Sequence, residues 1–557
     1  MGPGSRGMNR LTRRKWPDRK GAAGRAGRPA TAARGAVQGP VVSRTSPLCQ
    51  GPDGAAEASG KDVVGIRTIT LAFIICVAVG LFALNFVFDF PVANQHTYMV
   101  HALRLLGMPG LAQDWLAQTT DPAPLVTLLS ALALGLGGGA GIGVLYFGCC
   151  LSFVACWFAI AVRRGRLGPL EQFLALPFLL LPFFNPFNQR FAYGVAEQYI
   201  LGGYWQPSEA AGAALVIAFT LFVLGRPVLA VLAAAGAAAL HPGSLLAASL
   251  VAAMVVLELA ARRAWQRAAR VALAYALCTL PVLVWVALVF RGGATASAAE
   301  AARILVHERI PHHTLPAEWL GRRTAHVIGL VILAILAWWR DRRVAFGLAV
   351  LLGGGILLSL AVVLIDRDAA YLLFPWRISA LLVPLAWLLL SITVARAVSP
   401  VLRAGLGRWA ASVPGRLTAM ALILLGAATM PLSPFIRVIF PKNHARGLIA
   451  WVDAETAADA VFIVPLDFEW FRLKAGRPVL VDWKSNPFRD DEVIEWHARI
   501  AQSRRIMEAF CRTGRLPAEA AGLASLIVVD RHAGCRADPA AAAYRDADFA
   551  VFRIAPG

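Results

Sequence analysis

The feature that most constrains this chain is a series of apolar, nearly uncharged runs, each about the length of a helix that crosses a bilayer. Gly65–Phe88, Val271–Phe290 and Val344–Ile365 are examples. Crossing the hydrocarbon core takes about 20 such residues. Only 16% of the 557 residues are charged and 58% are hydrophobic, whereas about 25% of the residues of a soluble domain are charged. We therefore expect an all-α polytopic membrane domain.

The basic residues set the expected topology. Arg and Lys gather in the N-terminal tail and in short loops such as Arg163–Arg166, which places these segments in the cytoplasm. The net charge of +21 thus does not indicate nucleic-acid binding, for which basic residues would cover a folded soluble face. Threading the chain predicts about 11 transmembrane helices, with Leu125–Leu136 as a partial or re-entrant helix before the glycine-rich run. The predicted spans are Gly65–Phe88, Ile142–Val162, Glu171–Phe184, Ala210–Leu224, Pro227–Leu240, Ser244–Ala260, Val271–Phe290, Ala325–Trp338, Val344–Ile365, Tyr371–Ala395 and Leu417–Ile436.

Three regions follow from this threading. Residues 1–62, rich in Gly, Pro, Ala and Arg, are expected to be a disordered basic cytoplasmic tail. Residues 63–440 form the transmembrane domain, and residues 441–557 form a C-terminal extracytoplasmic α/β domain. In that domain "AVFIVP", "RPVLVDW", "SLIVVD" and "FAVFRI" predict strands, and "DDEVIEWHARIAQSRRIMEAFCR" predicts a helix. Cys511 and Cys535 can pair there if the domain lies in an oxidising compartment.

The two sides of the predicted membrane differ in chemistry. The inner loops are short basic connectors, whereas the outer loops carry Asp, His, Tyr, Trp and Asn. We therefore expect any functional site on the extracytoplasmic side. The outer segments are Asp89–Pro124, Asn185–Glu209, His241–Gly243, Arg291–Arg323, Asp366–Ala370 and the region after Phe440.

Within these segments, "NQHTYM…QDW", "ALHPG", "ERIPHHTLPAEW", "FPWRIS" and "GRPVLVDWKSNPF…EVIEW" resemble motifs of a bacterial group of GT-C-like membrane proteins. The resemblance covers roughly Gly65 to Ile500. It implies an inner-membrane glycosyltransferase of the GT-C superfamily that takes its sugar from a polyprenyl-phosphate donor. Its partners would be a lipid-linked sugar donor, a glycan or lipid acceptor and membrane lipids. GT-C enzymes carry an acidic residue, often a pair, in the first outer loop, where this chain has Asn94–His96 instead.

Two carboxylates in the first outer loop are the catalytic candidates. Asp114, in "QDW", could act as the general base on an acceptor hydroxyl, or it could cap a short helix or pair with an arginine. Asp89, at the end of the first helix, has the same two interpretations.

The substrate-binding candidates are polar residues of the same side. Arg377, near the outer end of a span, could bind the lipid phosphate through its forked guanidinium or pair with Asp366 or Asp368. His241 could bind phosphate or stabilise a tight turn. The remaining candidates are Asn94, His96, Tyr98, Arg309, His312 and His313.

A metal site is not predicted, although a divalent cofactor is compatible with the sequence. His312 and His313 are adjacent, and His307 is five and six residues away, unlike the i, i+4 pair of a helical zinc motif. Pro311 and Pro316 are instead expected to shape a loop over a cavity. In the tail domain, Asp490 and Asp491 suit a helix start, and Lys484 is open as a membrane or substrate contact.

Two other functional classes remain. A transporter or flippase of a lipid-linked glycan would show internal repeats and charges in mid-membrane. This sequence shows no convincing internal repeat, and charges within its spans are scarce. A non-catalytic GT-C-like scaffold fits the replacement of the acidic pair by Asn94–His96.

Overall fold

The computed structural model describes residues 59–555 apart from 88, 184–188, 291–294, 416, 419 and 422–444. The predicted disordered tail and most of the predicted span Leu417–Ile436 lie outside these residues. The predicted boundary between the membrane and tail domains, at residues 440–441, lies outside them as well. Residues Val63–Gly557 form one compact unit.

Apolar helices occupy all the other predicted spans. Five segments are long and apolar enough to cross a membrane, and four further apolar helices are shorter. The sequence thus located the helices correctly, while the count of 11 spans stays a prediction. The helices are α1 (Ser59–Asn85), α4 (Pro124–Arg163), α5 (Pro169–Leu180), α7 (Pro207–Val223), α8 (Pro227–Leu240), α9 (Leu245–Ala261), α10 (Trp265–Val289), α14 (Arg322–Ala337), α15 (Arg342–Ile365) and α17 (Ile378–Ala411).

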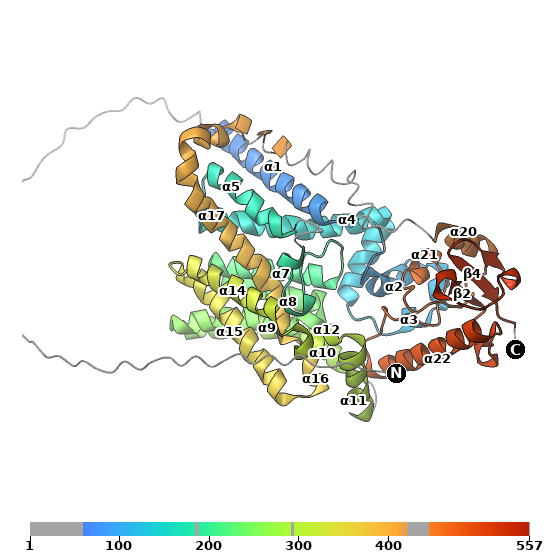
Figure 1. The fold of residues 1–557 in the computed structure, drawn as a ribbon. Coiled ribbons are helices and arrows are strands. Elements are labelled where there is room, and N and C mark those ends of the chain that lie inside the picture. The colour runs from blue at the N-terminus through green and yellow to red at the C-terminus, as the bar shows by residue number, and fades with distance from the viewer. Residues whose placement is uncertain are drawn as a thin grey trace, which may run out of the picture. The chain divides into compact units, whose positions relative to one another are not determined.

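The glycine-rich run breaks α4 into two arms (Figure 1). Gly138 has φ 55° and ψ −140°, outside the helical region, and such a conformation is one that glycine adopts readily. At Gly141 a Cβ atom would lie 2.0 Å from the carbonyl oxygen of Ala133. The break therefore needs glycine, and it separates Leu125–Leu136 from Ile142–Val162 as the sequence predicted.

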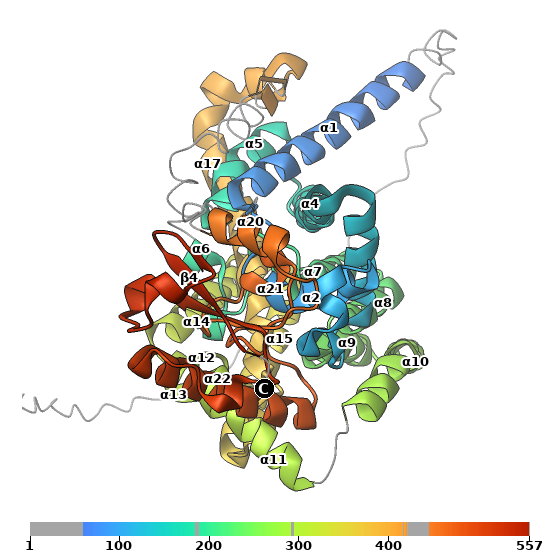
Figure 2. The same ribbon diagram turned by 90° about the vertical axis from the view of Figure 1, so that its right-hand side faces the viewer.

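The polar segments between the apolar helices fold into short helices that gather at one end of the helical bundle (Figures 1 and 2). Pro311 and Pro316 each begin a one-turn helix, at the first helical position that proline favours. The short helices are α2 (Gln95–Leu105), η1 (Pro109–Ala112), α3 (Trp115–Gln118), η2 (Leu181–Phe183), α6 (Gln189–Ala192), η3 (Val195–Glu197), η4 (Pro242–Ser244), α11 (Thr295–Arg303), the π-helix η5 (Ile304–Arg309), α12 (Pro311–Thr314), α13 (Pro316–Trp319), α16 (Asp368–Tyr371) and η6 (Pro375–Arg377).

The C-terminal region contains a four-stranded sheet in the order β1-β2-β4-β3. β1 and β2 are parallel, and the other two pairs are antiparallel. Three of the four predicted strands are therefore present, together with the predicted long helix. The elements are α20 (Arg446–Glu455), β1 (Phe462–Ile463), α21 (Phe471–Ala475), α22 (Asp490–Thr513), η8 (Ala518–Ala520), β2 (Leu526–Asp530), η9 (Arg531–Ala533), η10 (Pro539–Ala541), β3 (Tyr544–Arg545) and β4 (Phe549–Arg553).

Both faces of this sheet are buried, because successive side chains of a strand point to opposite faces. Ile527 and Val529 pack with α22 and with Ile304 of η5. Leu526 and Val528 pack in a separate core with α20 and α21.

The predicted strand "RPVLVDW" is wrong. Only Val479 forms an isolated bridge, to Phe462. The backbone then leaves the sheet, because Asp482 is fully buried and accepts hydrogen bonds from Arg472 and from the backbone N–H of Ser485.

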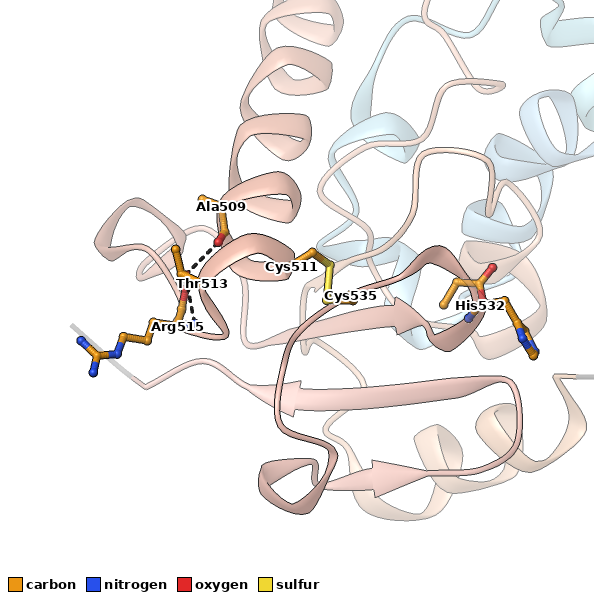
Figure 3. Close-up of a disulfide and its surroundings, with 7 residues drawn as sticks. Ala509, Cys511, Thr513, Arg515, His532 and Cys535 are labelled. Atoms are coloured by element: carbon orange, nitrogen blue, oxygen red, sulfur yellow. Dashed lines mark hydrogen bonds between the residues drawn. A yellow bond between two sulfur atoms is a disulfide. The ribbon is translucent and has the colours of Figure 1, made fainter.

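A disulfide joins Cys511, near the end of α22, to Cys535, in the loop after η9 (Figure 3). The sequence had left this pairing open. The bond fastens the long helix to the edge of the sheet, and disulfides of this kind are typical of extracytoplasmic domains.

A buried ion triad fixes the C-terminal domain to the first polar segment. Arg472 donates through Nε to Asp114 Oδ2 at 2.8 Å and through Nη1 to Asp482 Oδ2. The three side chains are at most 2% exposed. Close by, a Cβ atom at Gly110 would lie 2.1 Å from the carbonyl oxygen of Gly476, so the two backbones meet directly.

Replacing Arg472 by Met should strongly destabilise the protein, because two buried carboxylates would lose their counter-charge. Removing one partner of a buried ion pair costs about 3–5 kcal/mol. Lys474→Met is the matched control, because the Lys474–Asp89 pair is partly exposed and such pairs contribute about 0–1 kcal/mol. The measurement is the midpoint of thermal unfolding of the purified protein. Equal midpoints for the two variants would contradict a stabilising role for the triad.

Candidate functional site

The two predicted catalytic carboxylates lie in ion pairs with the C-terminal domain. Asp114 caps α3 through a hydrogen bond from the backbone N–H of Ala117 at 3.0 Å, and its other oxygen accepts from Arg472 and from the N–H of Val479. Asp89 pairs with Lys474 at 2.9 Å. Both oxygens of Asp114 are therefore occupied and enclosed by protein, an arrangement that favours its structural interpretation.

Arg377 sits instead at the centre of a polar cluster. Its Nε donates to Gln198 Oε1 at 3.1 Å, and its Nη1 donates to the carbonyl oxygen of Gly243 at 2.9 Å. The same Nη1 lies 3.3 Å from His241 Nε2, and the guanidinium lies over the ring of Phe374. All of these partners are neutral.

The alternative interpretation of Arg377, pairing with Asp366 or Asp368, is not borne out. Asp366 accepts a hydrogen bond from the Tyr371 hydroxyl, and Asp368 contacts His307 at 2.9 Å. Within the described residues, no carboxylate lies within 4.0 Å of the Arg377 nitrogens.

Strained backbone places the residues of this cluster. Ala196 and Glu197, directly before Gln198, have φ values of 56° and 57°, and Phe374, three residues before Arg377, has φ 48°. Non-glycine residues rarely adopt this region, and such strain concentrates at functional sites. His241 lies in extended conformation between α8 and η4, so it both ends the helix and faces Arg377.

Histidine 313 extends the cluster toward the proline-rich segment. Its Nδ1 lies 2.7 Å from the carbonyl oxygen of Ala196 and 3.1 Å from Gln198 Nε2. Burial, and after it the neighbouring His312, whose ring centroid is 4.0 Å away, lower its pKa to about 3. The ring is therefore neutral at physiological pH.

Two more cations approach from other elements. Arg309, the last residue of η5, donates through Nη2 to the carbonyl oxygen of Lys484 at 2.6 Å, while its buried Nε has no hydrogen-bond partner among the described residues. Burial lowers the pKa of the Lys484 ammonium, and so does the charge of Arg309. In the described part of the chain, neither residue has a carboxylate within ion-pair distance.

Tyr98 and His313 connect these cations. Burial raises the pKa of Tyr98, while the charges of Arg377 and Arg309 both act to lower it. Arg377 and Lys484 both act on His313. Arg309, Arg377 and Lys484, which we call the cation cluster, thus act on the same two side chains, and within the described residues none of the three has a carboxylate within 4.0 Å, although Asp482 and Glu469 act on Arg309 and Lys484 from further away. Concentrated positive charge of this kind binds anions, and arginine forks match phosphate oxygens.

One further carboxylate borders the cation cluster. Glu469 is half-buried and acts electrostatically on both Arg309 and Lys484. Burial raises its pKa, and Asp482 raises it further. A carboxylate with a raised pKa beside an anion site has the properties of a general base.

The structure thus brings together six of the ten predicted site residues: Tyr98, His241, Arg309, His312, His313 and Arg377. His96 is buried nearby, where its carbonyl oxygen accepts from Ser485 Oγ at 3.5 Å, and Asn94 precedes α2 without a capping bond. Asp89 and Asp114 face the C-terminal domain. Gln198 and Glu469 were missed, because neither stands in a motif with a recognisable spacing. In the described ranges, no group of three or more His, Cys, Asp or Glu residues is arranged to hold a metal ion.

Comparisons with known proteins give a family-model match and matches among solved structures. Residues 444–503, which contain Glu469, Arg472, Asp482 and Lys484, match the model of a domain of unknown function (DUF6798). The crystal structure of ArnT from Cupriavidus metallidurans, bound to undecaprenyl phosphate, is similar over 89% of this chain and 98% of its own, with 12% identity and a TM-score of 0.44. No curated protein matches the chain.

His96 should make stability depend on pH. Its side chain is 4% exposed, and burial lowers its pKa from 6.5 to about 3, helped by Lys474, Arg472 and Lys484. Above pH 6.5 the ring is neutral in both folded and unfolded states. Between pH 6.5 and 3 His96 is protonated in the unfolded chain but stays neutral in the folded protein. The free energy of unfolding therefore decreases by about 1.4 kcal/mol for each unit by which the pH is lowered.

His96→Gln removes this contribution. Unfolding midpoints of wild type and variant, measured from pH 7.5 to 4.5, should converge as the pH falls. Parallel curves would show that His96 is accessible to protons in the folded state.

Proposed function

We propose that this protein is a membrane glycosyltransferase of GT-C type, which uses a polyprenyl-phosphate-linked sugar on the extracytoplasmic side to modify a cell-envelope glycan or lipid. The observation that carries the proposal is the cation cluster. It lies where the ends of apolar helices that we assign to the extracytoplasmic side meet a folded domain, and within the described residues no carboxylate lies within 4.0 Å of its charges. A phosphate held in the membrane by a lipid tail supplies the missing negative charge.

Each cation has a distinct position in this proposal. Arg377, the last residue of η6, directly precedes α17 and binds the donor phosphate from the membrane side, oriented by Gln198 and His241. Arg309 and Lys484 approach from the side of the C-terminal domain. Concentrated positive charge also stabilises the phosphate as it leaves the sugar, which lowers the barrier to transfer.

Glu469 is the proposed base. An acceptor hydroxyl loses its proton as its oxygen attacks the anomeric carbon, and the bond from that carbon to the phosphate oxygen breaks. Asp114 cannot take this role without leaving Arg472. We therefore assign Asp114 and Asp89 to positioning the C-terminal domain.

The proposed sidedness rests on the disulfide and on the basic loops. The Cys511–Cys535 bond fits an oxidising compartment, and the arginine-rich connectors fit the cytoplasm.

The alternative is a GT-C-like scaffold that binds the lipid but transfers no sugar. The observation in its favour is that both carboxylates of the first polar segment are held in ion pairs. A protein that binds the lipid but transfers no sugar in the assay would support this alternative.

Arg377→Gln should weaken binding of undecaprenyl phosphate at least tenfold, because a charge-assisted hydrogen bond contributes about 1.5–3 kcal/mol. Native mass spectrometry of the purified protein, titrated with the lipid, measures the affinity. Arg505→Gln, on an exposed position of α22, is the matched control and should bind as wild type does. Undecaprenol, which lacks the phosphate, should not distinguish the variants. Wild-type affinity in Arg377→Gln would remove the basis of the proposal.

Glu469→Gln should lower transfer from a panel of undecaprenyl-phosphate sugars by 10²–10⁴-fold or so, with lipid affinity kept within about threefold. The matched control is Asp467→Asn, two residues away and exposed, which should retain full turnover. Undiminished turnover in Glu469→Gln would refute the assigned base. An inactive wild type that still binds the lipid would favour the scaffold.

A further inference from the structure

A second positively charged site lies along α17, away from Arg377. α17 (Ile378–Ala411) begins directly after Arg377 and carries Arg396, which lines this second site. The site is an open cavity of about 720 Å³, within the size range of ligand sites. Its lining residues are Arg164, Arg166, Arg262, Arg340, Asp341, Arg342, Arg343 and Arg396, and we call it the arginine cavity.

Carboxylates neutralise only part of this charge. Glu258 accepts from Arg343 at 2.7 Å and from Arg262 at 2.7 Å. Asp341 caps α15 through the N–H groups of Arg343 and Val344, and its other oxygen lies 3.7 Å from Arg164.

Four arginines are left without a carboxylate. Among the residues the structure describes, Arg166, Arg340, Arg342 and Arg396 have no carboxylate within 4.0 Å. Arg340 lies over the ring of Trp339. Seven arginines therefore face two carboxylates, and the excess positive charge points into one space.

The walls of the arginine cavity are held in place. Arg164 donates to the carbonyl oxygen of Val223 through Nε, at 3.0 Å, and through Nη2. Arg343 binds Glu258 through two nitrogens. Arg166 has φ 51°, a strained conformation for a residue with a side chain. Retention of cytoplasmic loops requires basic residues, but it does not require that arginines from four separate segments converge.

Two tryptophans place the cavity at the level of a membrane surface. Trp265, at the start of α10, and Trp339, beside Arg340, are each 65% exposed. Exposed tryptophans are typical of the membrane–water interface, and basic pockets between helices on the cytoplasmic side bind the head groups of anionic lipids.

We propose that the arginine cavity is a binding site for phosphate groups, filled in the membrane by the head group of an anionic phospholipid. Forked guanidinium groups from Arg166, Arg342 and Arg396 bind the phosphate oxygens, while Arg164 and Arg343 fix the cavity. This site is separate from the donor site, and it stands whether or not the protein transfers sugar.

The test uses the full-length protein with Arg166, Arg342 and Arg396 all changed to Gln. The matched control changes Arg504, Arg505 and Arg515 to Gln, three exposed arginines of the C-terminal domain. Native mass spectrometry counts the lipids retained from mixed micelles with cardiolipin, phosphatidylglycerol or phosphatidylcholine. Wild type and the control variant should retain cardiolipin and phosphatidylglycerol. The cavity variant should bind these two lipids at least tenfold more weakly. Phosphatidylcholine should bind weakly to all three proteins.

Soluble phosphate separates the two possible sources of the group. Competition by millimolar pyrophosphate, with cardiolipin binding much more tightly, supports the lipid as occupant. A different outcome is that wild type binds pyrophosphate tightly, the cavity variant does not, and neither protein binds the anionic lipids. That result supports the phosphate site and overturns its assignment to a lipid. Equal anionic-lipid binding by cavity variant and wild type, or equal losses in cavity and control variants, would overturn the site altogether. An unfolding midpoint of the cavity variant within a few degrees of wild type shows that the variant is folded.

Discussion

The position of the C-terminal domain depends on one buried guanidinium held between two carboxylates. Arg472 contributes the charge, Asp114 holds it from the first polar segment, and Asp482 holds it from the domain itself. A triad of this kind does not have to stabilise the fold more than apolar packing would. Its directional bonds do specify one arrangement of the two parts. Lys484 and Ser485 follow Asp482 immediately, so the triad also determines where these residues stand.

The candidate donor site is composite for this reason. Arg377 comes from the start of α17, Arg309 from the end of a π-helix, and Lys484 from the soluble domain. Neutral partners orient the first two, and strained residues precede Gln198 and Arg377. Charges that are partly buried without counter-ions are costly, and a fold retains them where a ligand supplies the opposite charge. The same reasoning applies at both ends of the helical bundle.

Much of the fold could be predicted, because apolar runs and basic loops report directly on how each helix meets a membrane. Three strands of the C-terminal domain and the long helix α22 could be predicted equally well from the sequence. The strand expected at "RPVLVDW" failed because a requirement from distant residues, the delivery of Asp482 to Arg472, outweighed local β propensity. For the site, the sequence found Arg377 and His313 through their unusual positions beside apolar spans. It did not distinguish Asp114 as a base from Asp114 as a partner of Arg472, because that contact spans 358 positions. Glu469 gave no signal, since only the fold brings it to Arg309 and Lys484.

Helix α17 gives this arrangement a fixed length. Arg377 precedes its first residue, and Arg396 lies 19 positions further on. At about 1.5 Å per residue the two guanidinium-bearing positions are about 28 Å apart along the axis, close to the thickness of a hydrocarbon core. In the topology that we propose, the two proposed anion-binding sites therefore lie near the two phosphate planes of a bilayer. Lipids can then reach either end by lateral diffusion within their own leaflet, and a membrane of different thickness would draw one end away from its plane.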